Sequence, residues 1–138
     1  MIFRQLFEPL SSTYTYLLGD EESGQAILID PVIASMERDL GELHRLGLKL
    51  AYTLDTHIHA DHITAALEMK RMVGSKIAAP AHDRLPCTDI AIEEGIPLQV
   101  GSICLQPLHT PGHTDGHFAY LFNDRVFTGD ALLIEGCG

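Results

Sequence analysis

Apolar and polar positions alternate in short runs over the first thirty residues, a pattern typical of strands bounded by turns. It predicts strands over residues 2–7, 13–18 and 25–29, with a turn at 20–24 before the third. We expect the three strands to form an antiparallel meander.

Helical spacing of apolar residues appears next. Ser35 is a predicted N-cap for a helix that runs to about residue 46 and ends at Gly47. A second helix is predicted over 63–73, ending at Gly74. The apolar faces are Met36, Leu40, Leu43 and Leu46 in the first helix, and Ile63, Ala66, Leu67 and Met72 or Val73 in the second.

Further strands are predicted over 49–55, 76–79, 103–108, 117–122 and 125–128, with a tight hairpin turn at 123–124. Residues 56–62 form the loop between a strand and the second helix, and 80–97 has no clear pattern and is expected to be mostly loop. The order of elements predicts a mixed α/β (α+β) fold with its loops gathered at strand ends.

Composition narrows the class of protein. The 138 residues suit one domain, and 9 Lys and Arg against 19 Asp and Glu give a formal charge of −10. This balance disfavours nucleic acid and anionic membranes as partners. The chain shows neither a signal peptide nor a long apolar run, and its three cysteines are not spaced as a disulfide framework or a zinc knuckle. We expect a cytoplasmic protein with reduced thiols.

Histidine is unusually frequent, with 8 residues, and the densest cluster follows the predicted strand 49–55. His57, His59, Asp61 and His62 fall within six residues. If the backbone stays extended after Asp55, positions 57, 59 and 61 point to the same side. Imidazole and carboxylate groups together suit Zn, Mn or Fe, so the cluster predicts a metal site. Asp61 has a second interpretation, as the N-cap of the helix that follows.

Two later residues are candidates for the same site. His113 lies between Gly112 and Thr114, and Asp130 follows Gly129 directly after a predicted strand. Glycine permits the unusual backbone angles of a loop that aims a side chain. The other histidines are not predicted ligands. His44 is expected on the polar side of the first helix, and His82 and His109 on the surface, whereas His117 begins a predicted strand close to His113 and is only a minor candidate for lining the site.

These segments resemble the metallo-β-lactamase superfamily and, within it, the persulfide dioxygenase branch. The resemblance implies an αββα sandwich, of which this chain covers the N-terminal half with the metal site as a single domain over 1–138, truncated at the C-terminus. The matching segments are FEPLSSTYTYLLGD at 7–20, ILIDPV at 27–32, THIHADHIT at 56–64, TPGHTDGH at 110–117 and FTGDALLIEGCG at 127–138.

The resemblance further implies one ferrous iron per chain, held by His57, His113 and Asp130, with Zn as a substitute metal. It implies that glutathione persulfide is oxidised by O₂ to sulfite and glutathione. The residues His59, Asp61, His62 and Thr114 would then orient the ligands, or the first three would bind a second metal, and Cys137 would lie near the substrate.

Two alternatives stay open. One is a dinuclear thioester hydrolase resembling glyoxalase II (hydroxyacylglutathione hydrolase), in which His59, Asp61 and His62 bind a second metal. The other is a metal-binding fragment without turnover. The family pattern has arginine where this chain has Glu135, which weakens the expectation of anionic substrate binding. A half sandwich would also expose a sheet edge, which predicts homo-oligomers through that edge.

Overall fold

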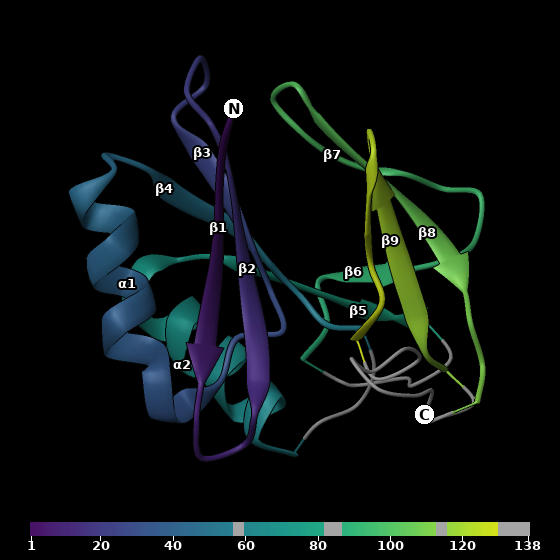
Figure 1. The fold of residues 1–138 in the computed structure, drawn as a ribbon, viewed down its shortest axis with the longest axis horizontal. Coiled ribbons are helices and arrows are strands. Elements are labelled where there is room, and N and C mark those ends of the chain that lie inside the picture. Colours follow the sequence, from purple (N-terminus) through teal and green to yellow (C-terminus); the bar gives the residue numbers. More distant parts are fainter. Residues whose placement is uncertain (57–59, 82–86, 113–115, 130–138) are drawn as a thin grey trace.

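Two β-sheets pack face to face, and two α-helices cover the outer face of the larger sheet (Figure 1). The computed structural model describes residues 1–56, 60–81, 87–112 and 116–129, with only the backbone at 60–64. No helix of the described residues lies on the outer face of the smaller sheet (Figure 1). The described residues thus form three layers of the predicted α/β metallo-β-lactamase-like αββα sandwich: one layer of helices and the two sheets.

The larger sheet has six strands in the order β1-β2-β3-β4-β5-β6. The first three pair antiparallel, as the predicted meander requires, and the pairs from β3 to β6 are parallel. The parallel strands end at one edge of the sheet, where ligand sites form in such folds. The bounds are β1 Ile2–Glu8, β2 Thr13–Asp20, β3 Gln25–Ile29, β4 Lys49–Leu54, β5 Lys76–Pro80 and β6 Ile90–Ile92.

The smaller sheet has four antiparallel strands in the order β10-β9-β8-β7. Their bounds are β7 Leu98–Val100, β8 Ile103–His109, β9 Phe118–Phe122 and β10 Arg125–Phe127. A tight turn joins β9 to β10 at the predicted position, and Asn123 adopts a positive φ of 51° there. Asparagine tolerates this left-handed conformation better than most residues.

Two apolar clusters hold the layers together. Between the sheets, side chains such as Leu18, Ile29 and Leu54 meet Leu105 and Tyr120 of the smaller sheet. The opposite face of the larger sheet packs against the helices. Strands β3 and β4 are therefore buried on both faces, which explains their nearly continuous apolar sequence.

The first helix follows its prediction closely. A 3₁₀ turn η1 (Ile33–Ser35) leads into α1 (Met36–Arg45), and Gly47 follows with a φ of 70°. All four predicted apolar residues of α1 and its end pack on the sheet, and His44 is exposed as expected. Ser35 is the N-cap of α1, as predicted, but it makes no side-chain capping bond, because its hydroxyl donates to the Val32 carbonyl, 3.4 Å away.

The second helix differs more from its prediction. The helix α2 (Ala60–Val73) begins three residues earlier than the pattern indicates. Among its described side chains, Ala65, Ala66 and Met69 are completely buried, whereas Met72 is 60% and Val73 38% exposed. The expected inward face is therefore wrong at its C-terminal end, because two small alanines mark the true buried face only weakly.

The remaining differences concern strand ends and short strands. Several strands are one or two residues longer or shorter than predicted, and β6 and β7 were not predicted. Each of these two strands has three residues, which is too short for an alternating pattern to be recognised. They complete the two sheets at the edges opposite β1 and β10.

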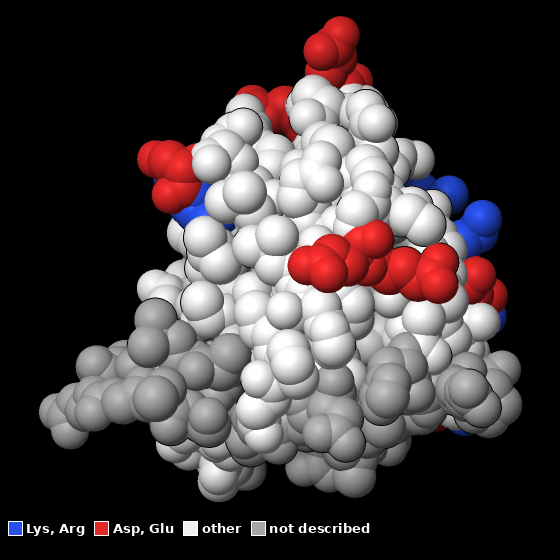
Figure 2. All heavy atoms as spheres, turned by 90° about the vertical axis from the view of Figure 1, so that its right-hand side faces the viewer, with Lys and Arg blue, Asp and Glu red and all other residues white. Residues whose placement is uncertain are grey.

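The surface seen in Figure 2 is mostly uncharged, with separate acidic groups and a few basic groups at its margin. No basic groove crosses the described part of this face, in line with the net charge of −10. Neither helix of the described residues is long and apolar enough to cross a membrane.

Candidate metal centre

Most of the predicted site residues lie outside the described part of the chain. The structure therefore defines the site through the residues that flank them. The residues outside the described ranges are His57, His59, His113, Thr114, Asp130, Glu135 and Cys137, together with the surface candidate His82.

The backbone of Asp61 and His62 belongs to the first turn of α2. The expectation of an extended backbone through position 61 is therefore wrong, and so is the prediction that Asp61 is the N-cap of α2. The helix begins at Ala60 instead, so Asp61 and His62 follow helical geometry.

Thr56 anchors the segment that carries His57. It follows β4 and is completely buried. Its backbone N–H donates to Asp30 Oδ1 over 2.8 Å, and its hydroxyl donates to Asp30 Oδ2 over 2.8 Å. The carboxylate of Asp30 thus receives two hydrogen bonds from one residue and fixes the start of the histidine-rich segment.

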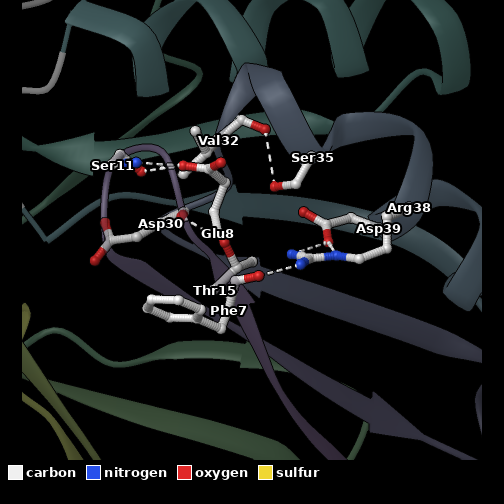
Figure 3. A network of polar contacts seen from close by, with 9 residues as sticks. All are labelled: Phe7, Glu8, Ser11, Thr15, Asp30, Val32, Ser35, Arg38 and Asp39. Carbon is white, nitrogen blue, oxygen red and sulfur yellow. Dashed lines mark hydrogen bonds and ion pairs between the residues drawn. The ribbon is translucent and has the colours of Figure 1, made fainter.

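Asp30 itself is held in an unusual conformation directly after β3. Its φ is 53°, a value that non-glycine residues rarely adopt. The backbone N–H of Asp30 donates to the Leu54 carbonyl over 2.9 Å. The Thr15 hydroxyl donates to the Asp30 carbonyl over 2.9 Å, as Figure 3 shows. These bonds stabilise a strained backbone that directs the carboxylate to Thr56.

The two sheets are joined at the same place. The phenol of Tyr120, on β9, donates to the Asp55 carbonyl over 2.7 Å. The backbone N–H of Phe118 donates to the Thr56 carbonyl over 2.7 Å. The start of β9 is therefore fixed to the residue before His57, although the two segments are far apart in the sequence.

Thr110 and His117 bracket the segment that carries His113. The Thr110 backbone N–H donates to the His117 carbonyl over 2.9 Å. The Thr110 hydroxyl and His117 Nδ1 are hydrogen-bonded at 2.8 Å. His109, the residue before Thr110, is exposed as expected, and its ring contacts Phe118 with centroids 5.2 Å apart. The segment 110–117 is thus closed at its base by a backbone bond and a side-chain bond.

Gly129 brings the third segment to the same point. It precedes Asp130 and has a φ of 54°. A Cβ atom at this position would lie 2.5 Å from Thr56 Oγ1 and 2.8 Å from His117 Nε2. Real Cβ atoms do not approach other atoms so closely, so only glycine fits without displacement. The backbone before Asp130 therefore touches the residues that hold the other two segments.

These contacts bring together the three segments that carry His57, His113 and Asp130. Two imidazoles and a carboxylate form a donor set that suits Fe²⁺, Zn²⁺ or Mn²⁺. The framework is compatible with a metal centre, because Thr56 and Gly129, the residues before His57 and Asp130, and Thr110 and His117, on either side of His113, are held by hydrogen bonds or close packing. Among the side chains that the structure describes, no three His, Cys, Asp or Glu residues converge on one point.

Other notable carboxylates lie in the described framework. Hydrogen bonds from Ser23 and Ser102 lower the pKa of Asp20 to about 2 and connect the two hairpins at one end of the sandwich. Burial raises the pKa of Asp39 to about 6, although Arg38 opposes this effect (Figure 3). Their partners are residues of the hairpins and of α1, outside the candidate site. The hydrogen-bonded charge of Asp20 stabilises the fold, whereas the buried charge of Asp39 opposes it.

Sequence reasoning missed Asp30, Thr110 and the role of His117. Asp30 ends an apolar strand within ILIDPV, and an acidic residue at the end of a parallel strand is a usable signal. From the sequence His117 is only a minor candidate, but the structure places it, completely buried, against Gly129, the residue before Asp130. Nothing in the local sequence indicates its hydrogen bond with Thr110.

The fold and this framework define a class of protein. The sequence profile of the Metallo-beta-lactamase superfamily matches residues 9–138, and the chain belongs to this superfamily. The resemblance noted in the sequence is thereby confirmed.

Within the superfamily, the chain is similar to persulfide dioxygenases. It is 44% identical to "Persulfide dioxygenase ETHE1, mitochondrial" of Bos taurus over 140 residues, which cover 100% of this chain and 55% of the relative. The crystal structure of ETHE1 from Myxococcus xanthus superimposes with a TM-score of 0.94 at 48% identity, covering 100% of this chain and 61% of that one.

A second group of relatives has a different activity in its name. The "Hydroxyacylglutathione hydrolase" of Methylococcus capsulatus is 38% identical over 133 residues, or 94% of this chain and 51% of the relative. The chain therefore spans about half the length of the curated relatives it matches.

Proposed function

We propose that this chain provides the metal centre of a persulfide dioxygenase, in which one ferrous ion is held by His57, His113 and Asp130. The observation that carries the proposal is the similarity to the ETHE1 proteins, at 48% identity and a TM-score of 0.94 over the whole chain. The substrate would be glutathione persulfide, which O₂ and water convert into glutathione and sulfite.

The chemistry supplied by a bound ferrous ion would be activation of O₂ beside the persulfide sulfur. The chain's own residues supply geometry. Thr56 would position the segment with His57, and Gly129 would position Asp130. The hydrogen-bonded pair Thr110 and His117 closes the base of the segment with His113. Three donors attached to fixed points leave the opposite side of the ion for substrate.

A dinuclear thioester hydrolase is the second candidate, because relatives named hydroxyacylglutathione hydrolase are 38% identical over 94% of the chain. This activity would require His59, Asp61 and His62 as ligands of a second metal. The described framework is compatible with both candidates, and the greater identity to the persulfide dioxygenases favours the first.

Metal content and two activity assays separate the candidates. For the protein purified without oxygen, we expect about one iron per chain, lost in His57→Ala and retained in His59→Ala and Asp61→Ala. Glutathione persulfide should stimulate oxygen uptake, with zinc-loaded protein as an inactive control. Two metals per chain that all three substitutions reduce, with cleavage of S-acyl glutathione without O₂, would establish the hydrolase instead.

Absence of both activities, with metal still bound, would support the third interpretation, a metal-binding fragment without turnover. Cytoplasmic location also stays a prediction, since the mammalian relatives are named mitochondrial. Cys137 near the substrate and Thr114 beside His113 are proposed contacts that their alanine variants would test in the same assays.

A further inference from the structure

His117 is a histidine that the predicted ligand set does not use. It directly precedes β9, and its side chain is completely buried. Burying an imidazole is favourable only when its polar atoms have partners. The position of these partners indicates what the residue does.

One side of the ring faces the base of the segment with His113. Nδ1 of His117 lies 2.8 Å from Thr110 Oγ1, and the two residues are also joined through the Thr110 N–H and the His117 carbonyl at 2.9 Å. The backbone bond sets the distance across the base of the segment. The side-chain bond additionally fixes the rotation of the imidazole ring.

The other side of the ring faces the segment with Asp130. Nε2 of His117 would lie 2.8 Å from a Cβ at Gly129, so the ring edge packs against that backbone. Thr56 Oγ1 packs against the same glycine, at 2.5 Å from the same Cβ position. Gly129 therefore packs against both His117 and the residue that precedes His57.

From this arrangement we infer that His117 is a positioning residue that sets the spacing between the His113 segment and Asp130. The Thr110 hydrogen bond orients the ring, and the oriented ring edge supports Gly129. The inference rests on the proposed metal centre, but it does not depend on which metal is native or which reaction follows. An imidazole is required because a smaller side chain cannot reach Thr110 and Gly129 together.

The test uses Co²⁺ as a spectroscopic probe, titrated into metal-free protein and followed by its visible absorption. We expect His117→Ala to weaken Co²⁺ affinity on the order of 10- to 100-fold, the usual effect of removing a residue that orients metal ligands. The shape of the absorption band should change as well. His117→Asn retains a polar atom near the place of Nδ1 but not the ring edge that contacts Gly129, so it should restore only part of the affinity lost in His117→Ala.

Thr110→Val tests the same contact from its other end without changing the shape of the side chain. It should weaken Co²⁺ binding as His117→Ala does, and the double variant should lose little more, because both changes remove the same interaction. His44→Ala is the matched control, since this side chain is exposed on α1, and its affinity should equal that of the wild type.

The free energy of unfolding of each metal-free variant separates positioning from packing. If His117→Ala lowers it while Co²⁺ affinity and the absorption band stay unchanged, the inference is wrong. Full wild-type affinity in His117→Asn would likewise overturn it, because the contact of the ring with Gly129 would then not be needed. If the wild type does not bind Co²⁺ at all, the proposed metal centre fails first, and the inference fails with it.

Discussion

Replacing Gly129 by alanine tests the close packing beneath the candidate metal centre. The φ of 54° makes alanine unfavourable there by about 1–2 kcal/mol even in open space. The added Cβ would also lie 2.5 Å from Thr56 Oγ1 and must displace it. That hydroxyl donates to the Asp30 carboxylate, and a hydrogen bond to a charged group contributes about 1.5–3 kcal/mol. The expected loss in the free energy of unfolding is therefore about 3–5 kcal/mol.

Gly47→Ala provides the matched control for this substitution. Gly47 has a φ of 70°, but nothing lies within 4 Å of the position of its Cβ. It therefore measures the backbone cost alone, about 1–2 kcal/mol. Urea denaturation of the metal-free proteins gives both values, and metal titration shows whether the loss at Gly129 extends to binding. Equal losses at the two glycines would refute the packing argument, as would unchanged metal affinity in Gly129→Ala.

Three further measurements test the framework. Burial raises the pKa of Asp39 from 3.8 to about 6, so its charge destabilises the fold above that pKa and has no effect below pH 3.8. Asp39→Asn should therefore raise the free energy of unfolding by about 1–3 kcal/mol at pH 8 and leave it unchanged near pH 3.5. Denaturation at the two pH values measures both. Asp30→Asn removes the charged acceptor of Thr56 and should lower the unfolding free energy and the metal affinity together; loss of stability alone would contradict its role at the site. Sedimentation velocity at rising concentration should reveal self-association, because β1 is an edge strand, and a monomer at all concentrations would rule this out.

The sequence predicts elements best where a wide apolar face meets a wide polar face. In α1, Leu43 and its apolar neighbours repeat at helical intervals beside charged positions, so both the helix and its buried side are predicted correctly. In α2 the buried face includes Ala65 and Ala66, which contribute little apolar signal. Packing of small residues against a sheet is set by tertiary contacts, and local periodicity does not report it.

In the candidate site, too, local patterns are predicted from the sequence and tertiary contacts are not. The spacing of His57, His59, Asp61 and His62 is a local signal and predicts metal binding from the sequence alone. The position of Asp30 at the end of a strand is a weak signal, but its partner Thr56 lies 26 residues away and the contact requires β3 and β4 to pair. Donor residues can thus be recognised by their type and spacing, whereas the residues that hold them are identified only after folding.

The same framework also explains how one fold serves the two activities named among its relatives. The described anchors lie beside the segments that carry His57, His113 and Asp130, the three donors predicted for both candidates. The hydrolase would additionally require His59, Asp61 and His62, of which the last two belong to the first turn of α2. We therefore expect a second metal, if one binds, to depend on the start of α2 and not on the strands. Metal stoichiometry in the Asp61→Ala variant tests this expectation and discriminates between the candidates more directly than the fold does.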